Sequence, residues 1–540
     1  MNFIFKKFKK FIFLRIFFHF VYILAIASLP TVIKYMIDDS YSNGIYDVVK
    51  LTGIFVLLIV IGMGAQYLSQ RSAWRLEKEF NLYFRENLFS VIICKEPSDF
   101  NKNSIGDYNS RLNNDIASCA EYLEYTMMIF ESLISFIIYA IYIFILNYKI
   151  AIIIYLVALI VLYLPNLTAN KFSKKKKKLL DDTAFYNSKI IDLLSGYAFI
   201  NYFTYKNIKK NYESSLNRME DSRYSFGKFK TFVNVLNGMV MYMINISSFG
   251  IMAFLLYKGE ITAGVATATI AYIQNFMFPL RTVIDAISLR KSVETVMKNI
   301  LLEISENKNL ELENVKFTNN IKCDNVSFKY DDYIIKNFSY TFEKNKKYAI
   351  IGESGKGKST LLNLINGNLS CTGGRITIDD REVSYRFCNQ LIMYLTQKSH
   401  IFSENFWDNV TIFDSFDKTV LERDNRYIPR NKVDILLKSK NNNELSGGEK
   451  QLVNYLRAIL SGKEILLLDE PFSAMDKNME KYVCSKLLEM EDKTIIMITH
   501  NVEKDFLDKF DKLPIYATIS VQIFFSYIFH LSVLYNYLFI

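Results

Sequence analysis

The chain has 540 residues, carries 65 Lys and Arg against 55 Asp and Glu, and is 51% hydrophobic. Only 22% of its residues are charged and 15% are aromatic, which excludes an intrinsically disordered chain. The 20 Gly and 7 Pro exclude a collagen-like chain. The six Cys are scattered without a CxxC pair, so reduced packing thiols are expected rather than a disulfide framework or a zinc site.

The first half of the chain contains apolar runs long enough to cross a membrane. A helix needs roughly 20 apolar residues to span about 30 Å of hydrocarbon. We therefore predict an all-α membrane domain over residues 1–300 with six transmembrane helices, the sixth being rich in Ala and Thr. The helices are expected near residues 11–33, 51–70, 127–146, 150–170, 232–257 and 261–280.

Lysines flank the first and fourth apolar runs. Four lysines precede residue 11, and residues 174–178 are all lysine. Because positive charge stays on the cytoplasmic side, the N-terminus is predicted to be cytoplasmic in a multi-pass protein of the plasma or inner membrane. The lysine run itself is either a solvated helix face or a contact with anionic lipid headgroups.

The two longest connections, residues 71–125 and 171–231, keep a helical apolar periodicity. They are predicted to be cytoplasmic extensions of the membrane helices. Each has one break, at Pro97-Ser98-Asp99 and at Ser195-Gly196. A break midway lets a helix pair turn back through a short connecting piece.

Three ionisable residues lie inside the apolar runs. Arg15, His19 and Glu131 could mark a substrate path. For Arg15 and His19, near the inner edge, snorkelling to the interface is the alternative. Glu131 is expected near the outer boundary.

Residues 311–512 change character and read as an α/β P-loop NTPase domain of alternating strands and helices. A buried strand ends at Ile351 and an apolar helix begins near Leu361, with a glycine-rich loop between them. Its glycines let backbone N–H groups converge on phosphates, Lys358 is predicted to reach the β- and γ-phosphates, and Ser359 to bind Mg²⁺. The loop comprises Gly352, Glu353, Ser354, Gly355, Lys356, Gly357, Lys358, Ser359 and Thr360.

A second strand ends in two acids, Asp469 and Glu470. In a parallel sheet, its carboxyl end is expected to lie beside the P-loop. Asp469 is then placed for the Mg²⁺ shell, and Glu470 to orient an attacking water.

Ser446, Gly447 and Gly448 open a further helix and form a second phosphate cradle by the same physics. One nucleotide does not need two cradles in one chain. A two-fold homodimer resolves this, with the cradle of each chain closing the P-loop of the other.

Taken together, these motifs resemble those of ATP-binding cassette (ABC) transporters over nearly the whole chain. The resemblance implies that Gln397 is a metal ligand and γ-phosphate sensor, that His500 contacts the γ-phosphate, and that Tyr330 stacks on adenine. It also assigns residues 473–476 to the D-loop, which follows the catalytic strand.

A six-helix domain fused to one cassette is similar to the half-transporter exporters. The resemblance implies a homodimer that binds ATP and Mg²⁺, catalyses ATP hydrolysis through Lys358, Glu470 and His500, and exports an unidentified peptide, lipid or hydrophobic small molecule. Coupling turns are expected near residues 98–103 and 195–199, the second contacting the partner's cassette. A regulator or sensor gated by ATP is the alternative, and no nucleic acid partner is expected.

Two features depart from the family. The segment just before Leu445 lacks the acidic-glycine pattern of the exporters, and the stretch from Gln397 to it is short. Residues 513–540 contain no formal charge and are dense in apolar residues. They are expected to be either a reading-frame disruption, which would leave an inactive degenerate exporter, or a seventh membrane span.

Overall fold

The computed structural model describes residues 2–40, 45–305, 315–353, 355–397, 400–423, 445–500, 504–511 and 515–516. It divides into two compact units. The first comprises Met1–Val91 and Ile105–Asn307, and the second comprises Lys308–Ile540 with the short stretch Ile92–Ser104. The main division coincides with the change from apolar to charged sequence.

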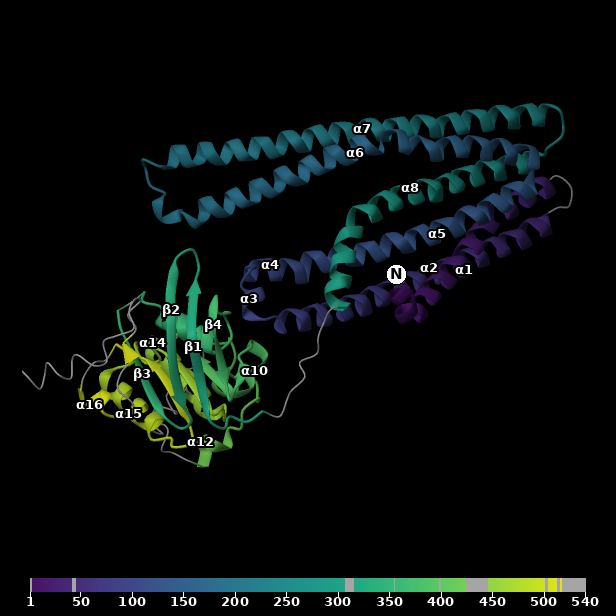
Figure 1. Cartoon of the computed structure of the whole chain (residues 1–540). Helices are drawn as coiled ribbons and strands as arrows, with labels where there is room; N and C mark the ends of the chain where they lie inside the picture. Colours follow the sequence, from purple (N-terminus) through teal and green to yellow (C-terminus); the bar gives the residue numbers. More distant parts are fainter. Residues whose placement is uncertain are drawn as a thin grey trace, which may run out of the picture. The chain divides into compact units, whose positions relative to one another are not determined.

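Long helices build the first unit (Figure 1). Each of the six apolar runs falls in a different helix, and most of these helices continue far beyond the run. The six are α1 (Asn2–Ser40), α2 (Ile45–Ile93), α5 (Ile116–Leu146), α6 (Tyr148–Ser195), α7 (Tyr205–Tyr257) and α8 (Ala263–Ser305).

Both predicted breaks are confirmed. After α2 the chain forms α3 (Pro97–Phe100), whose first residue is a proline, which needs no backbone hydrogen bond there. Helix α6 ends at Ser195 with Gly196 as its C-cap, before the short 3₁₀ helix η2 (Tyr197–Phe199). The return from α3 runs through α4 (Ile105–Ser110) and the π-helix η1 (Arg111–Asp115) into α5.

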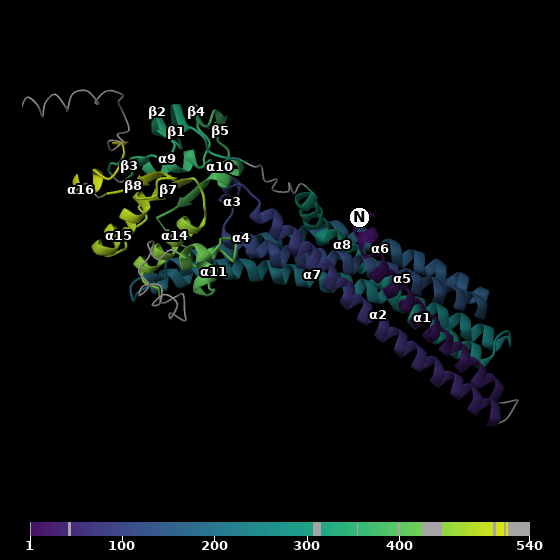
Figure 2. The same cartoon turned by 90° about the horizontal axis from the view of Figure 1, so that it is seen from below.

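The first unit packs as two groups of helices. Helices α6 and α7 lie side by side in both views, while α5 packs against α8 and α1 (Figures 1 and 2). A buried apolar cluster joins the two groups within the apolar runs. It includes Ala27 of α1, Ile143 of α5, Ile154 of α6, Leu255 of α7 and Tyr272 of α8. The burial of these side chains aligns the apolar runs with one another.

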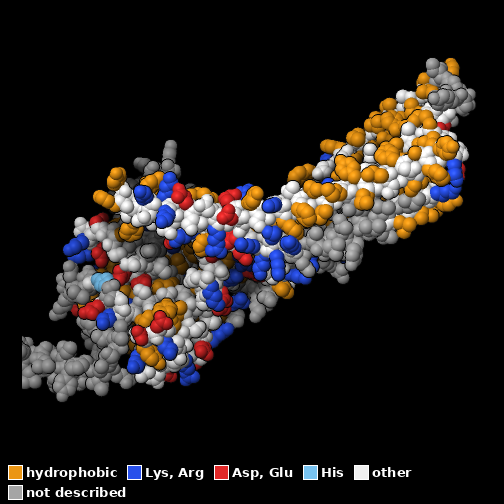
Figure 3. Space-filling model, turned by 90° about the horizontal axis from the view of Figure 1, so that it is seen from above, with side chains coloured by type: hydrophobic (Ala, Val, Ile, Leu, Met, Phe, Trp, Pro, Cys, Tyr) orange, Lys and Arg blue, Asp and Glu red, His pale blue; other side chains and the backbone are white. Residues whose placement is uncertain are grey.

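Three described segments are long and apolar enough to cross a membrane, namely Phe5–Asp38, Tyr46–Ile93 and Ile105–Leu146. A shorter apolar helical segment covers Asn245–Tyr257. The side chains of residues 157–170 lie outside the described part, and the full count of six spans stays a prediction. Apolar side chains predominate over one end of the helical unit in Figure 3, and charged side chains over the other.

The expectations for the charged residues of the first unit need correction. Arg15 does not snorkel: its side chain is buried and forms ion pairs with Glu124 and Glu131 of α5. Because Arg15 and Glu131 form an ion pair, they lie at the same level of the helical unit, so their expected places at opposite membrane boundaries are wrong. Sequence periodicity could not reveal this pairing, because Arg15 is 109 residues from Glu124 and 116 residues from Glu131 along the chain.

The second unit is an α/β domain with two sheets. The parallel sheet has the order β6-β7-β8-β3-β9, and the antiparallel sheet has the order β2-β1-β4-β5. All residues of β3, β7 and β8 are buried, as expected for central strands of a covered parallel sheet. The strands are β1 (Asn320–Lys329), β2 (Tyr333–Glu343), β3 (Lys347–Ile351), β4 (Gly373–Ile378), β5 (Arg381–Glu382), β6 (Ile392–Leu395), β7 (Ile465–Asp469), β8 (Thr494–Ile498) and β9 (Ile515–Tyr516).

Helices cover the parallel sheet and are held by two buried apolar clusters, one on each side of it. They are α9 (Lys358–Ile365), α10 (Tyr385–Leu391), α11 (Phe406–Thr411), α12 (Thr419–Arg423), α14 (Gly447–Leu460), α15 (Lys477–Leu488) and α16 (Lys504–Leu507). Helix α9 follows β3 in the chain after one short loop, and α14 precedes β7. The sheet therefore sets the relative positions of the loops at its carboxyl edge.

The apolar C-terminal run does not begin as a membrane helix. Ile515 pairs with Ile350, and Tyr516 with Ile351, so β9 adds a parallel strand beside β3. Ile515 and Tyr516, where hydropathy allowed a seventh span to begin, thus pair with the sheet edge instead. Residues 517–540, which hold the rest of that predicted tail, lie outside the described residues.

Candidate functional site

The glycine-rich loop connects β3 to α9 as predicted. Gly355 and Gly357 have φ of +78° and +80°, a region that favours glycine. A Cβ at Gly357 would also lie 2.8 Å from Ile334 Cγ2. The glycines therefore permit a turn that brings the chain into α9 with its first backbone N–H groups free of intrahelical partners. Ser354 of this predicted loop lies outside the described residues.

Lys358 is the buried cation of the loop. Its Nζ donates to the carbonyl oxygens of Gly352 at 2.6 Å and Glu353 at 2.8 Å, and the residue is 5% exposed. An ammonium whose hydrogen bonds in the described loop go to neutral carbonyl oxygens can exchange them for phosphate oxygens. The neighbouring Lys356 is half-exposed and lies 3.8 Å from the Glu353 carboxylate instead.

Asp469 lies at the carboxyl end of β7. Strand β8 separates β7 from β3, yet the Asp469 carboxylate is hydrogen-bonded to Ser359 at the start of α9 and to Tyr394 of β6. Burial raises the pKa of Asp469, with the Ser359 hydrogen bond and the charge of Lys358 acting in the opposite direction. A carboxylate beside a hydroxyl, partly removed from water, is a suitable pair of oxygen ligands for Mg²⁺.

Glu470 contacts two other predicted site residues, Gln397 and His500. Its Oε2 accepts a hydrogen bond from Gln397 Nε2 at 2.9 Å, and its Oε1 lies 2.7 Å from His500 Nε2. Its backbone has a φ of +47°, which is rare for a residue with a side chain. Strained backbone of this kind concentrates at functional sites, and here it follows a strand whose ladder fixes its position.

The Ser446–Gly448 turn opens α14 through a capping box. The Ser446 backbone N–H donates to Glu449 Oε2 at 2.7 Å, and Glu449 N–H donates to Ser446 Oγ at 3.3 Å. Added Cβ atoms would lie 3.2 Å from Ala474 Cβ at Gly447 and 3.0 Å from Ala474 O at Gly448. The turn therefore packs tightly on the loop after β7, and its described contacts are with that loop rather than with Lys358.

Gln451, the last residue of the motif that begins at Leu445, makes contacts that sequence reasoning did not assign. It is 6% exposed, its Oε1 accepts from the Ala474 N–H at 2.8 Å, and its Nε2 donates to Ser473 Oγ at 3.2 Å. One amide thus ties α14 to the loop that follows Glu470. Its place one helical turn after Gly447 was the available signal.

Two further residues, Tyr394 and Arg457, make polar contacts between separate elements of the domain. Tyr394 accepts a hydrogen bond from Asn363 Nδ2 at 3.3 Å while it contacts Asp469. Arg457 of α14 is 6% exposed and donates to the carbonyl oxygens of His400 and Asn409, each at 2.7 Å. Neither pattern is visible in sequence, because each depends on the packing of separate elements.

Tyr330 follows β1 and is 66% exposed. Its ring meets Phe328 edge-on, with centroids 5.0 Å apart and an interplanar angle of 86°. The described contacts do not join it to the phosphate-binding residues. An exposed ring face is what stacking on a base requires.

Comparison with known proteins agrees with this arrangement. The model of the ABC transporter transmembrane region matches residues 12–280, and the ABC transporter model matches residues 335–473. The ATP-dependent lipid A-core flippase of Photobacterium profundum is 24% identical over 507 residues, covering 87% of this chain and 85% of that protein. The flippase of Vibrio parahaemolyticus is 23% identical over 518 residues, covering 89% and 86%.

A processing and transport protein is also similar over a shorter length. The lactococcin-G-processing and transport ATP-binding protein of Lactococcus lactis is 29% identical over 361 residues, covering 61% of this chain and 50% of that protein. Among solved structures, a bacterial Atm1-family ABC exporter with ATP bound has the same fold, with a TM-score of 0.75 and 19% identity over 93% of this chain and 92% of that one. The chain belongs to the ABC transporter family and is an ATP-hydrolysing transporter of the exporter type, with its membrane region fused to its ATP-binding domain.

Proposed function

We propose that two copies of this chain form a homodimer that exports a substrate by alternating access, driven by ATP bound with Mg²⁺. The observation that carries this proposal is the convergence of Lys358, Asp469 and Glu470 at the carboxyl edge of one parallel sheet. Lysine, metal-binding carboxylate and water-orienting carboxylate are the three components that phosphoryl transfer to water needs.

Each site residue has a proposed role. Lys358 binds the β- and γ-phosphates with the backbone N–H groups of residues 352–360, and Ser359, Asp469 and Gln397 hold Mg²⁺, which would neutralise phosphate charge when bound. Glu470 accepts a hydrogen bond from the attacking water and orients it. His500 donates from Nε2 to the γ-phosphate.

The homodimer completes each site. The capped turn at Ser446, Gly447 and Gly448 has backbone N–H groups that suit phosphate. Its described contacts are with the loop after β7 and not with Lys358 of the same chain. We place it over the nucleotide bound to the partner's P-loop. ATP then favours the closed pair of cassettes because only that state contacts the nucleotide from both sides.

The connecting pieces after α2 and α6 transmit this closure. The stretch Ile92–Ser104, which contains α3, groups with the cassette unit, which supports a coupling role for it. We assign the second coupling turn to η2 and its contact to the partner's cassette. We propose that the chain lies in the plasma or inner membrane with its cassettes and N-terminus on the cytoplasmic side, because lysines flank the first and fourth apolar runs.

A transport assay distinguishes an exporter from a regulator gated by ATP. Inverted membrane vesicles carrying the full chain are expected to accumulate at least one member of a labelled panel of amphiphilic cations, amphiphilic anions and short peptides when ATP is supplied. Vesicles with Glu470→Gln are the control. ATP hydrolysis without ATP-dependent accumulation of any panel member would favour the regulator.

Replacing Tyr330 by Ala is expected to weaken ATP binding about tenfold, because stacking of a base on an aromatic ring is worth roughly 1–3 kcal/mol. Tyr330→Phe keeps the ring and is expected to bind as the parent does. Equilibrium binding of labelled ATP measures both. Tyr333→Ala, an exposed tyrosine at the start of β2, is the matched control; equal weakening by both Ala variants would contradict the stacking role.

Replacing Gln451 by Leu is expected to lower kcat for ATP hydrolysis more than it changes KM. The variant leaves the Ala474 N–H without its acceptor and frees the loop after Glu470, at a cost of roughly 1–3 kcal/mol. Gln451→Glu retains an acceptor and is expected to be less impaired. Gln390→Leu, on exposed α10 surface, controls for loss of a glutamine; an unchanged kcat in Gln451→Leu would rule out the positioning role.

A further inference from the structure

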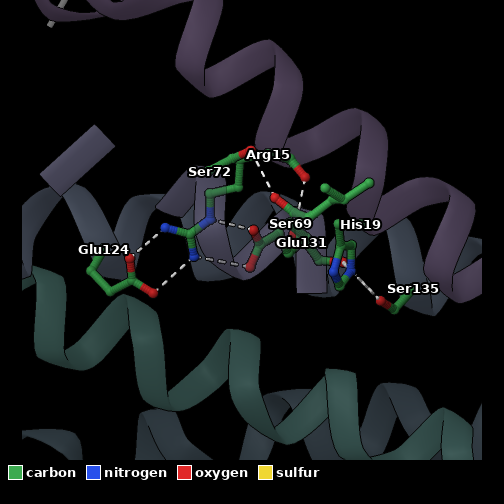
Figure 4. Close-up of polar contacts among 8 residues, drawn as sticks. Arg15, His19, Ser69, Ser72, Glu124, Glu131 and Ser135 are labelled. Carbon is green, nitrogen blue, oxygen red and sulfur yellow. Dashed lines mark hydrogen bonds and ion pairs between the residues drawn. The ribbon is translucent and has the colours of Figure 1, made fainter. Parts of the chain in front are cut away.

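A charged cluster joins α1 to α5 inside the first unit. The Arg15 guanidinium donates to both oxygens of Glu124, at 2.5 and 2.8 Å, and to both oxygens of Glu131, at 2.5 and 3.2 Å. Figure 4 shows the guanidinium lying between the two carboxylates. Glu124 and Glu131 are two turns apart on α5, so both reach the same face of that helix.

The cluster keeps one negative charge in excess, because one guanidinium faces two carboxylates. In the described part of the chain, Arg15 is the cation within 4 Å of either carboxylate. Arg15, Glu124 and Glu131 all lie in segments apolar enough to span a membrane, with Glu124 just before the apolar run of residues 127–146. Unbalanced charge is costly in such surroundings, and ionisable groups there pair with one another or mark a substrate path.

His19 does not supply the missing positive charge directly to a carboxylate. Its Nε2 lies 3.0 Å from the backbone carbonyl oxygen of Glu131 and 3.0 Å from Ser135 Oγ. A carbonyl oxygen only accepts, so Nε2 carries a hydrogen and donates to it. This contact fixes α1 against α5 one turn beyond Arg15, and Ser69 Oγ of α2 adds a hydrogen bond to the Arg15 carbonyl oxygen at 3.2 Å.

The two carboxylates differ in access. The side chain of Glu131 is 15% exposed and that of Arg15 is 5% exposed, whereas that of Glu124 is 51% exposed. Glu124 also lies just before the apolar run of α5. It is therefore the member of the cluster most accessible to an approaching positively charged group.

From this geometry we infer that Glu124 is a binding subsite for a positively charged group of the transported substrate, and that the substrate class is an organic cation with apolar parts. The inference rests on the proposed export function. Arg15 and Glu131 act as positioning residues that hold the Glu124 carboxylate at the start of the membrane domain. The excess charge is balanced when the cation binds.

A matched pair of probes tests the sign of the charge. Tetraphenylphosphonium and tetraphenylborate have nearly the same size and shape with opposite charges. The full-length protein in lipid nanodiscs, without nucleotide, is expected to bind labelled tetraphenylphosphonium and to bind tetraphenylborate at least tenfold more weakly. Empty nanodiscs correct for partition into lipid.

Glu124→Gln is expected to raise the Kd for tetraphenylphosphonium about tenfold, which corresponds to about 1.4 kcal/mol. The glutamine retains hydrogen bonding to Arg15, and thermal unfolding of the variant checks that it folds. Glu121→Gln is the matched control, because Glu121 is exposed one turn earlier on α5 and its carboxylate lies near Tyr125 rather than Arg15. The control is expected to bind as the parent does.

Several results would overturn the inference. They are equal binding of both probes, no binding of the cation by the parent, an unchanged Kd in folded Glu124→Gln, and equal weakening in Glu121→Gln. Because the assay contains no nucleotide, its failure is distinguishable from failure of the export proposal. A parent protein that hydrolyses ATP and drives transport but ignores the cation overturns the subsite alone.

Discussion

Replacing Glu470 by Gln is expected to reduce ATP hydrolysis by about 100- to 10,000-fold, the usual contribution of a positioned general base. Glutamine has the same shape and keeps one acceptor oxygen for Gln397 or His500, so ATP binding is expected to persist. It carries no charge to polarise the water between the side chain and the γ-phosphate. Steady-state phosphate release and equilibrium binding of labelled ATP measure the two properties separately.

A carboxylate at the other end of the same strand provides the control. Glu464, just before β7, forms an ion pair with Lys344 at 3.1 Å and accepts a hydrogen bond from the Phe317 backbone N–H. Glu464→Gln is expected to hydrolyse ATP as the parent does. Rapid turnover by Glu470→Gln, or an equal loss in the Glu464 variant, would remove Glu470 from the catalytic role.

Replacing Lys358 by Ala is expected to reduce hydrolysis by about 100- to 1,000-fold and also to weaken ATP binding. Loss of one pre-positioned donor to developing phosphate charge has effects of that size. Lys358 Nζ lies within the loop on the carbonyl oxygens of Gly352 and Glu353, where the phosphates are expected to bind.

The neighbouring lysine makes this prediction specific. Lys356 lies in the same loop, but its Nζ is 3.8 Å from the largely exposed Glu353 carboxylate. Lys356→Ala is expected to lose much less activity than Lys358→Ala. Equal losses would show that the net charge of the loop matters rather than the position of one ammonium.

Much of the cassette could be predicted because its motifs are local. The strand, glycine loop and helix at Gly352–Lys358 follow each other directly, and backbone sterics at Gly357 leave few alternatives to glycine. Apolar residues ending in Asp469 and Glu470 likewise predict a central strand with two acids at its edge. In both places, residues that are adjacent in the sequence are also the ones that lie together in the structure.

The contacts that sequence could not supply join residues far apart in the chain. The insertion of β8 between β7 and β3 follows from sheet topology, and so does the hydrogen bond from Asp469 to Ser359. The positive φ of Glu470 depends on the ladder behind it. Gln451 reads in sequence as one polar residue of a helix, and only packing reveals its two bonds to the loop after Glu470.

The membrane unit shows the same limit. Apolar length placed the helices, and Pro97 and Gly196 marked where they turn. Hydropathy treats Arg15 and Glu131 as isolated exceptions, because it assigns a value to each residue and none to a pair. The packing of α1 on α5 brings them together with Glu124, which lies outside every apolar run. Hydropathy also allowed a seventh span from residue 513, whereas Ile515 and Tyr516 form strand β9 beside β3.

The central claim is that each nucleotide is hydrolysed between Lys358 of one chain and Ser446 of the other. Lipid nanodiscs holding one or two copies of the full-length protein can be separated and their copy number checked by mass. We predict that ATP hydrolysis is confined to discs with two copies. Discs with a single chain that hydrolyse ATP at the same rate per chain would contradict the claim.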